Sequence, residues 1–125
     1  MISGIVVFAH GSRIESANEG VRMAAARLAE LGSFRHVEPA FLELGTPDLA
    51  GAVERLVRLG VDYVLVIPYF LTLGLHLERD LPAIISGLRS AHPGARIEMT
   101  PPLEGHPALI QVLLERAQEY LTIPH

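Results

Sequence analysis

The chain has 125 residues, a mass of 13.6 kDa and a formal net charge of −4, with 50% hydrophobic and 19% charged residues. This length predicts a single domain over residues 1–125, with its own core and a folded surface of about 6,600 Å². The composition excludes a disordered chain, and the negative charge argues against a nucleic-acid partner. No apolar run approaches the ~18 residues of a membrane span, so no membrane partner is expected.

Two residue types are absent, and their absence removes several kinds of chemistry. Without cysteine there are no disulfides, thiolate nucleophiles, zinc ribbons or iron–sulfur clusters. All 10 basic residues are arginine, which excludes Schiff-base lysines and a P-loop lysine. The start of the sequence has neither the basic stretch nor the cleavage site of a signal peptide. We therefore expect a cytoplasmic protein, which is the simplest setting for a chain without cysteine.

The first predicted unit is a strand followed by a helix. The β-branched run at 5–9 predicts a strand buried on both faces, with a loop at 10–13 after it. A helical pattern covers 16–31, and Gly32 stands where a C-cap glycine belongs. The expected buried face of this helix consists of apolar residues three or four positions apart: Val21, Ala24, Ala25 and Leu28.

The second predicted unit repeats this layout. A strand is expected within 36–44, at an edge of the sheet because Pro39 cannot donate to a ladder. Thr46 is the predicted N-cap of the next helix and Pro47 its first residue, and Gly60 ends it. The apolar stripe of this helix is Leu49, Val53, Leu56 and Val57.

Two further units complete the pattern. A strong strand at 63–67 leads into a long loop at 69–79, and a helix is expected to start near Asp80. A short strand at 96–99 and a diproline break precede a last helix over 107–121. The expected inward faces of these helices are Leu81, Ile84, Ile85 and Leu88 in the first, and Leu109, Ile110, Leu113, Leu114 and Ala117 in the second.

Alternating strands and helices predict an α/β fold with a four-stranded parallel sheet covered on both faces. Among the few topologies that right-handed crossovers allow, we favour a doubly wound, flavodoxin-like order of 2-1-3-4, which puts the strand with Pro39 at an edge. Ligands of such sheets bind beyond the carboxyl ends of the strands, at the switch point between strands 1 and 3. His10 and the loop that carries His76 flank this point.

Each of these histidines, taken alone, is more often a hydrogen-bonded loop residue than a ligand, and both interpretations stay open at this point. Their shared placement at one switch point favours a functional role. The other histidines have no such placement, and structural or surface roles are expected for His36, His92 and His125. Glu104 and His106 are expected to be the solvated start and the cap of the last helix.

The chemistry left to the chain is that of imidazole, carboxylate, arginine and backbone donors. The hydrolase signature G-x-S-x-G and the dinucleotide fingerprint G-x-G-x-x-G are both missing. Neutral imidazole binds divalent ions such as nickel, iron, zinc and cobalt, and it is also a base near neutral pH. Two histidines with a carboxylate can therefore hold a divalent metal ion without the thiolates that make a site hard to empty.

Three blocks of sequence resemble one family: VFAHGSR at 7–13, AFLEL at 40–44 and PYFLTLGLHLERDLP at 68–82. They are similar to the sirohydrochlorin chelatases of the CbiX type, and most similar to the short form, which is one half of the class II chelatase fold. The third block is the most specific, and the likeness extends over nearly the whole chain. A small departure is Ala9, where glycine often precedes the histidine.

The resemblance implies insertion of a divalent metal ion into sirohydrochlorin. It assigns metal binding and catalysis to His10 and His76, with His10 as the expected proton acceptor and Glu43 as a further candidate ligand. The segment from Leu71 to His76 matches the substrate-contacting loop of the family. The substrate-binding candidates besides His76 are Arg13, Glu43, Gly45, Leu71, Thr72, Leu73, Gly74 and Leu75.

The resemblance favours cobalt as the metal, for cobalamin biosynthesis, with nickel or iron insertion as alternatives. A different class of function is a non-catalytic carrier of metal or tetrapyrrole. No permanently bound cofactor is expected, since the metal ion is a substrate. A homodimer is expected, because a tetrapyrrole is wide for one small domain and the longer chelatases of this class have two similar halves.

Overall fold

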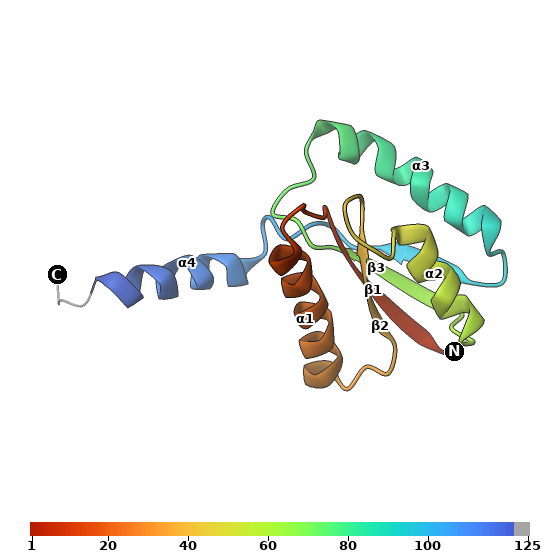
Figure 1. Cartoon of the computed structure of the whole chain (residues 1–125), viewed down its shortest axis with the longest axis horizontal. Helices are drawn as coiled ribbons and strands as arrows, with labels where there is room; N and C mark the ends of the chain where they lie inside the picture. Colours follow the sequence, from red (N-terminus) through yellow and green to blue (C-terminus); the bar gives the residue numbers. More distant parts are fainter. Residues whose placement is uncertain (122–125) are drawn as a thin grey trace.

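The computed structural model describes residues 1–121, in which four strands alternate with four helices (Figure 1). The strands are β1 (Ser3–Ala9), β2 (Val37–Phe41), β3 (Tyr63–Pro68) and β4 (Arg96–Met99). The helices are α1 (Glu15–Gly32), α2 (Leu49–Arg58), α3 (Leu75–Ala91) and α4 (Pro107–Tyr120). His125 lies outside the described residues. Within 1–121, no helix is both long and apolar enough to cross a membrane.

The sheet confirms the predicted α/β class and strand order. Its order is β2-β1-β3-β4, and every neighbouring pair is parallel. β2 lies at an edge, as Pro39 predicts, and β1 and β3 lie at the centre. β1 is buried on both faces, whereas β3 alternates between buried and half-buried residues. The register pairs Val6 with Val66 and Phe8 with Pro68, so the carboxyl ends of β1 and β3 lie side by side.

One face of the sheet carries the larger core. Alternate residues of the central strands point to this face, where α2 and α3 pack on them. The fully buried members include Val6, Phe8, Val64 and Val66 from the strands. The helices contribute the predicted stripes, of which Val53, Leu56, Leu81, Ile85 and Leu88 are buried. Ile84, predicted to point inward, is 37% exposed, because the helix turns it toward the rim of the sheet rather than the core.

The opposite face is covered only in part. α1 packs Ala25 against Ile5 and Val7 of β1, with Val21 and Leu28 alongside. The predicted inward face of α1 is thereby confirmed at its centre. The boundary at its end differs from the prediction: Gly32 is the last helical residue, and Ser33 takes the left-handed C-cap conformation with a φ of 54°.

The start of α2 also differs from the prediction. Asp48, not Thr46, is the N-cap, and its carboxylate accepts a 2.8 Å hydrogen bond from the backbone N–H of Gly51. Pro47 lies outside the helix because its carbonyl oxygen accepts a hydrogen bond from the N–H of Phe41 at 2.9 Å. That bond keeps the preceding chain beside β2 and delays the first helical turn.

α3 begins five residues before the predicted start at Asp80, at Leu75. A start near Asp80 would have placed Pro82 in the first turn, where proline is tolerated best. In the structure Pro82 lies inside the helix, and the extra turn is stabilised by Leu77, which packs against the main core. His76 is therefore a residue of a helical first turn and not of a loop.

α4 is the element for which the sequence prediction fails most. Its predicted inward face, centred on Leu113, is exposed, and no residue of the helix is buried. Figure 1 shows α4 extending away from the sheet and the other three helices. The prediction assumed that a last helix packs on its own sheet. The chain instead leaves β4 through Pro101 and Pro102 and directs the helix outward.

Candidate active site

His10 is the first exposed residue after the buried strand β1. Its backbone is held on one side by the segment after β2: the N–H of Leu42 donates to the carbonyl oxygen of Ala9 at 2.9 Å, and that of Glu43 donates to His10 at 3.1 Å. The imidazole lies edge-on to the ring of Phe70, with 6.3 Å between ring centroids. The backbone position of this histidine is therefore determined by strand pairing, while its side chain stays open to solvent.

Gly11 allows the two segments to approach this closely. Its φ is +93°, a region that side-chain-bearing residues rarely adopt, and a Cβ atom here would overlap the carbonyl oxygen of Glu43. Asn18 of α1 links the same two loops by hydrogen bonds. Its side chain accepts from the N–H of Ser12 and donates to the carbonyl oxygens of Ser12 and Leu44, each at 2.9 Å. The loop that carries His10 is thus held both by the segment after β2 and by Asn18 of α1.

His76 reaches the same edge of the sheet from α3. Gly74, with a φ of 75°, precedes the helix and turns the chain into it. Nδ1 of His76 faces a guanidinium nitrogen of Arg79 at 3.5 Å, and Nε of Arg79 pairs with the Asp80 carboxylate at 3.0 Å. The first turn of α3 thus presents one imidazole with a charged pair beside it.

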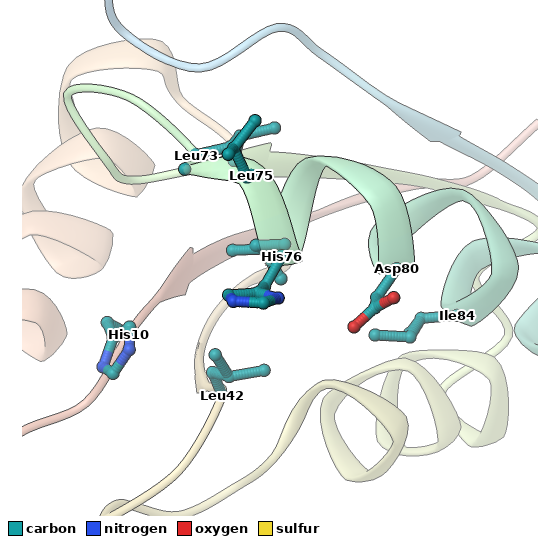
Figure 2. A pocket seen from close by; sticks show the side chains of 9 residues that line it. His10, Leu42, Leu73, Leu75, His76, Asp80 and Ile84 are labelled. Carbon is teal, nitrogen blue, oxygen red and sulfur yellow. The ribbon is translucent and has the colours of Figure 1, made fainter.

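Both histidines line one cavity of about 310 Å³ at the carboxyl edge of the sheet (Figure 2). His10 comes from the end of β1 and His76 from the start of α3, and Leu42 lies beside His76 in the view. The remaining wall is mostly apolar. The lining residues are His10, Leu42, Leu73, Gly74, Leu75, His76, Leu77, Asp80 and Ile84. This shape combines an apolar surface with a small number of polar groups, as ligand sites commonly do.

The predicted substrate residues divide into two groups. Leu73, Gly74 and Leu75 lie on the cavity wall together with His76, whereas Leu71 and Thr72 are exposed and outside it. The carbonyl oxygen of Leu71 accepts a 2.8 Å hydrogen bond from the N–H of Glu104, which holds this loop to the segment before α4.

Three other candidates lie in the loops around His10. Glu43 does not line the cavity, but a carboxylate oxygen of it is 3.8 Å from Nδ1 of His10. Gly45 rests against the ring of Phe41, where a Cβ atom would come within 2.8 Å. Arg13 is exposed in the loop after His10. Of the three, only Glu43 makes an interaction with a candidate catalytic side chain.

The sequence prediction missed four residues of the wall: Leu42, Leu77, Asp80 and Ile84. Asp80 could have been found, because it lies four residues after His76 and such pairs share one helix face. That signal was hidden while His76 was assigned to a loop. Asn18 was also missed, although it stands three and seven positions before Val21 and Ala25 on the inward face of α1.

The arrangement can hold a metal ion loosely and move protons. Within residues 1–121, no three His, Asp or Glu side chains converge in a metal-binding cluster. His10 and His76 therefore form a sparse donor set on an open wall. Few ligands and an exposed position suit an ion that has to leave the protein, whereas structural metal sites are closed by four ligands.

The remaining described histidines have local structural roles. His106 is the N-cap of α4, and its Nδ1 accepts a 3.0 Å hydrogen bond from the N–H of Ala108, as predicted. His92 is the C-cap of α3 and donates its N–H to Leu88. The carbonyl oxygen of His36 accepts from the N–H of Ile5 at 2.9 Å.

Comparison with known proteins identifies a family whose members this chain resembles. The model of the CbiX family matches residues 4–120. A sirohydrochlorin cobaltochelatase of Sulfolobus acidocaldarius is 29% identical over 120 residues, which cover 96% of this chain and 94% of that protein. A sirohydrochlorin cobaltochelatase of Methanopyrus kandleri is 37% identical over 81 residues, or 65% of this chain and 57% of that protein. The chloroplastic sirohydrochlorin ferrochelatase of Arabidopsis thaliana is 31% identical, with 95% of this chain and 53% of that protein covered.

The matched segments therefore cover little more than half of the last two relatives. Solved structures agree in fold. A putative cobalamin biosynthesis CbiX protein from Marinobacter aquaeolei VT8 superposes with a TM-score of 0.85 at 32% identity, covering 96% of this chain and 98% of that one. The sirohydrochlorin chelatase SirB from Bacillus subtilis subspecies spizizenii, in complex with cobalt, gives 0.87 at 25% identity, covering 96% of this chain and 51% of that one.

Proposed function

Because the chain belongs to the CbiX family, we propose that it is a chelatase that inserts divalent cobalt into sirohydrochlorin, a step of cobalamin biosynthesis. Two relatives named sirohydrochlorin cobaltochelatase support this choice of substrate and metal. The structural observation that carries the proposal is the shared cavity of His10 and His76 at the carboxyl edge of β1 and β3. There, two imidazole side chains face solvent beside an apolar wall.

The reaction exchanges one ion for two protons: the metal ion enters the macrocycle, and two pyrrole nitrogens each lose a proton. Nδ1 of His10 faces the carbonyl oxygen of Gly11 at 3.3 Å and Glu43 at 3.8 Å. With the proton on Nδ1, the other ring nitrogen of His10, Nε2, is free to accept a pyrrole proton. In His76, Nδ1 faces a guanidinium nitrogen of Arg79, which can only donate, so this contact leaves the lone pair of the neutral ring on Nδ1. The metal ion therefore replaces Arg79 at Nδ1, or binds Nε2 after the ring proton has moved to Nδ1.

The wall around the histidines fits a large, flat, partly apolar substrate. Leu42, Leu73 and Leu75 supply apolar area for the macrocycle. Sirohydrochlorin also carries carboxylate groups, and Arg13 is an exposed cation in the His10 loop that can bind one of them. The cavity is open, so the remaining carboxylates stay hydrated. Glu43 acts on the orientation of His10 and is a further candidate ligand for the incoming metal ion.

Iron is the second candidate metal, because the plant relative is named a ferrochelatase. The donor set itself does not separate cobalt, nickel and iron, since imidazole binds all three. We further propose that the working form is a homodimer and that it is cytoplasmic. The dimer is supported by the relatives of about twice this length, and the location by the cysteine-free composition alone.

The decisive experiment follows the absorption spectrum of sirohydrochlorin with Co²⁺ and a trace of protein. We expect His10→Ala and His76→Ala each to lower the rate by about 100-fold or more, the low end for loss of a positioned base. His92→Ala is the matched control, because this histidine caps α3 at the far end from the cavity and should leave the rate unchanged.

The same assay separates the alternatives. Metallation that stops at one equivalent per protein would identify a carrier, and full activity in the His76→Ala variant would contradict the site. Parallel reactions with Ni²⁺ and Fe²⁺ rank the metals. Because both proposed roles need neutral imidazole, acid should inhibit the reaction.

A further inference from the structure

Asn18 of α1 is the one buried polar side chain within residues 1–121, and it is only 1% exposed. It lies on the inward side of the helix, where the next positions toward the sheet are the apolar Val21 and Ala25. Burying an amide costs free energy unless its polar atoms are hydrogen-bonded, whereas an apolar side chain has no such cost. The partners of Asn18 therefore indicate what the residue does.

Those partners belong to two different loops. Oδ1 of Asn18 accepts from the N–H of Ser12, and Nδ2 donates to the carbonyl oxygens of Ser12 and Leu44, each at 2.9 Å. Both donor hydrogens and the acceptor of the amide are thus used on backbone groups. Ser12 follows His10 by two residues, and Leu44 directly follows Glu43. One buried side chain therefore connects the loop of His10 with the loop of Glu43.

Backbone hydrogen bonds join the same loops on the other side of these two residues. The N–H of Leu42 donates to Ala9 at 2.9 Å and that of Glu43 to His10 at 3.1 Å, which continues the pairing of β1 with β2. Past Glu43, the described part of the chain has no further backbone hydrogen bond between the two loops. The side chain of Asn18 supplies the next connection, at the point where the backbones separate.

The side chains of His10 and Glu43 do not hold themselves together. They are 59% and 57% exposed, with 3.8 Å between Nδ1 and the carboxylate oxygen. An exposed pair of this kind contributes little free energy, because water screens it and both side chains lose freedom. The spacing of the two groups therefore depends on the separation of the two backbones that carry them.

The backbone beside Glu43 is also in a conformation that needs support. Leu44 has a φ of 56°, a left-handed value that a residue with a side chain rarely adopts. Such a conformation persists where surrounding contacts hold it. The carbonyl oxygen of Leu44 is bonded to Asn18, so the same amide that sets the loop separation also supports this strained position.

We propose that Asn18 is a positioning residue for metal insertion: it fixes the separation of the His10 and Glu43 loops, so that both side chains meet the incoming ion or proton at a constant spacing. This inference rests on the proposed function for the identity of the reaction. Asn18 does not line the cavity, so it acts only through the two residues it positions. A misplacement of reacting groups by about 1 Å is enough to slow a reaction substantially.

Two substitutions of similar size remove the connection in different ways. Asn18→Asp keeps the acceptor but places a carboxylate oxygen against two carbonyl oxygens, and Asn18→Leu removes all three hydrogen bonds without adding a charge. We expect each to lower the rate of cobalt insertion about ten-fold in protein that urea unfolding shows to be folded. Leu28→Ala is the matched control. It weakens the packing of α1 on the sheet away from the loops and should leave the rate unchanged.

A double-mutant comparison separates positioning from a general structural role. In a Glu43→Ala background there is no spacing left to maintain between the two side chains, so Asn18→Leu should cost less than about three-fold in rate. A structural role would cost the same factor in both backgrounds. Equal factors, or a folded Asn18→Leu protein with the natural rate, would overturn the proposal.

A spectroscopic measurement tests the same point without the reaction. The imidazole NMR signal of His10, identified as the one missing from His10→Ala, should shift in both Asn18 variants and stay in place in Leu28→Ala. If neither variant folds, Asn18→Ala leaves room for water at the three backbone groups and should show the same shift. An unmoved signal in a folded Asn18 variant would overturn the proposal.

The two measurements also keep this inference apart from the proposed function. A protein that does not metallate sirohydrochlorin, but whose His10 signal responds to Asn18, would refute the proposed function and retain the positioning role. A chelatase whose rate and His10 signal both ignore Asn18 would do the reverse.

Discussion

α2 and α4 both carry apolar residues at helical spacing, but they lie in opposite environments. Leu56 in α2 is 0% exposed, whereas Leu113 in α4 is 64% exposed. Both helices have a side-chain N-cap, Asp48 in α2 and His106 in α4. N-capping therefore does not explain the difference, although the apolar and polar faces of α2 are more sharply separated than those of α4.

Chain connectivity explains the difference. α2 follows β2 and precedes β3, two strands of one parallel sheet, so both of its ends are tied to that sheet. A crossover of this kind has to lie across the sheet. α4 follows β4, and within residues 1–121 no further strand of the sheet follows it. An amphipathic pattern thus predicts that the apolar face of a helix will be buried. The connectivity of the chain decides whether its own sheet buries that face.

The largest expected effect is on the free energy of unfolding, which core and surface substitutions in the two helices should change differently. Leu56→Ala should lower the free energy of unfolding by about 2–5 kcal/mol at any protein concentration, because it opens a cavity in the core. Leu113→Ala should cost less, because this side chain is 64% exposed in the single chain. If the proposed homodimer covers it, the cost should depend on protein concentration. Urea unfolding at two concentrations checks both. A concentration-independent loss of equal size in Leu113→Ala would break the comparison.

Two glycines allow a comparison of the loops that precede α1 and α4. Gly11 has a φ of +93° and Gly105 a φ of +81°, but only at Gly11 would a Cβ atom meet other atoms. Gly105→Ala should cost about 1–2 kcal/mol, the strain of the left-handed conformation. Gly11→Ala should cost more and should also displace His10, since the overlap is with the backbone of Glu43. Thermal unfolding and the chelation rate measure both effects. Equal losses of stability in the two variants would contradict the close packing of the Gly11 loop against Glu43.

The two N-caps provide a smaller contrast. Asp48→Ala should lower the free energy of unfolding by about 1 kcal/mol, the usual value for a lost cap. His106→Ala should change the unfolding of the body much less, because α4 can fray without exposing core residues. Chemical denaturation at a concentration that keeps the chain monomeric measures both. A larger loss for His106→Ala would show that α4 packs on its own chain.

The smallest expected effect is a dependence on acid. The hydrogen bond from Arg96 holds the pKa of Glu98, on β4, below its ordinary value. A lowered folded-state pKa stabilises the fold above the unfolded pKa, and this contribution disappears as the pH falls through the folded value. The stability gap between the natural protein and Glu98→Gln should therefore narrow in acid. The control repeats the comparison in an Arg96→Ala background, where the donor of this hydrogen bond is gone and the narrowing should be smaller.

The site was predictable in part because strand polarity does not depend on side-chain packing. His10 follows a strand that its continuous apolar run identifies clearly. Because β1 and β3 are parallel, the segment after β3, which carries His76, starts at the same edge of the sheet. Asp80 was not predictable from the assumed loop, since its position relative to His76 depends on where α3 starts. Leu42 lies in a segment whose place depends on hydrogen bonds to β1.

By itself, the sequence determined the four strand–helix units, the parallel sheet and the two histidines at its carboxyl edge. These follow from local patterns of hydrophobicity and from the few crossovers a parallel sheet permits. The tertiary structure decided the start of α3, the approach of Glu43 to His10 across Gly11, and the outward course of α4. Each of these depends on contacts between segments distant in the chain, whose free energies no local pattern encodes.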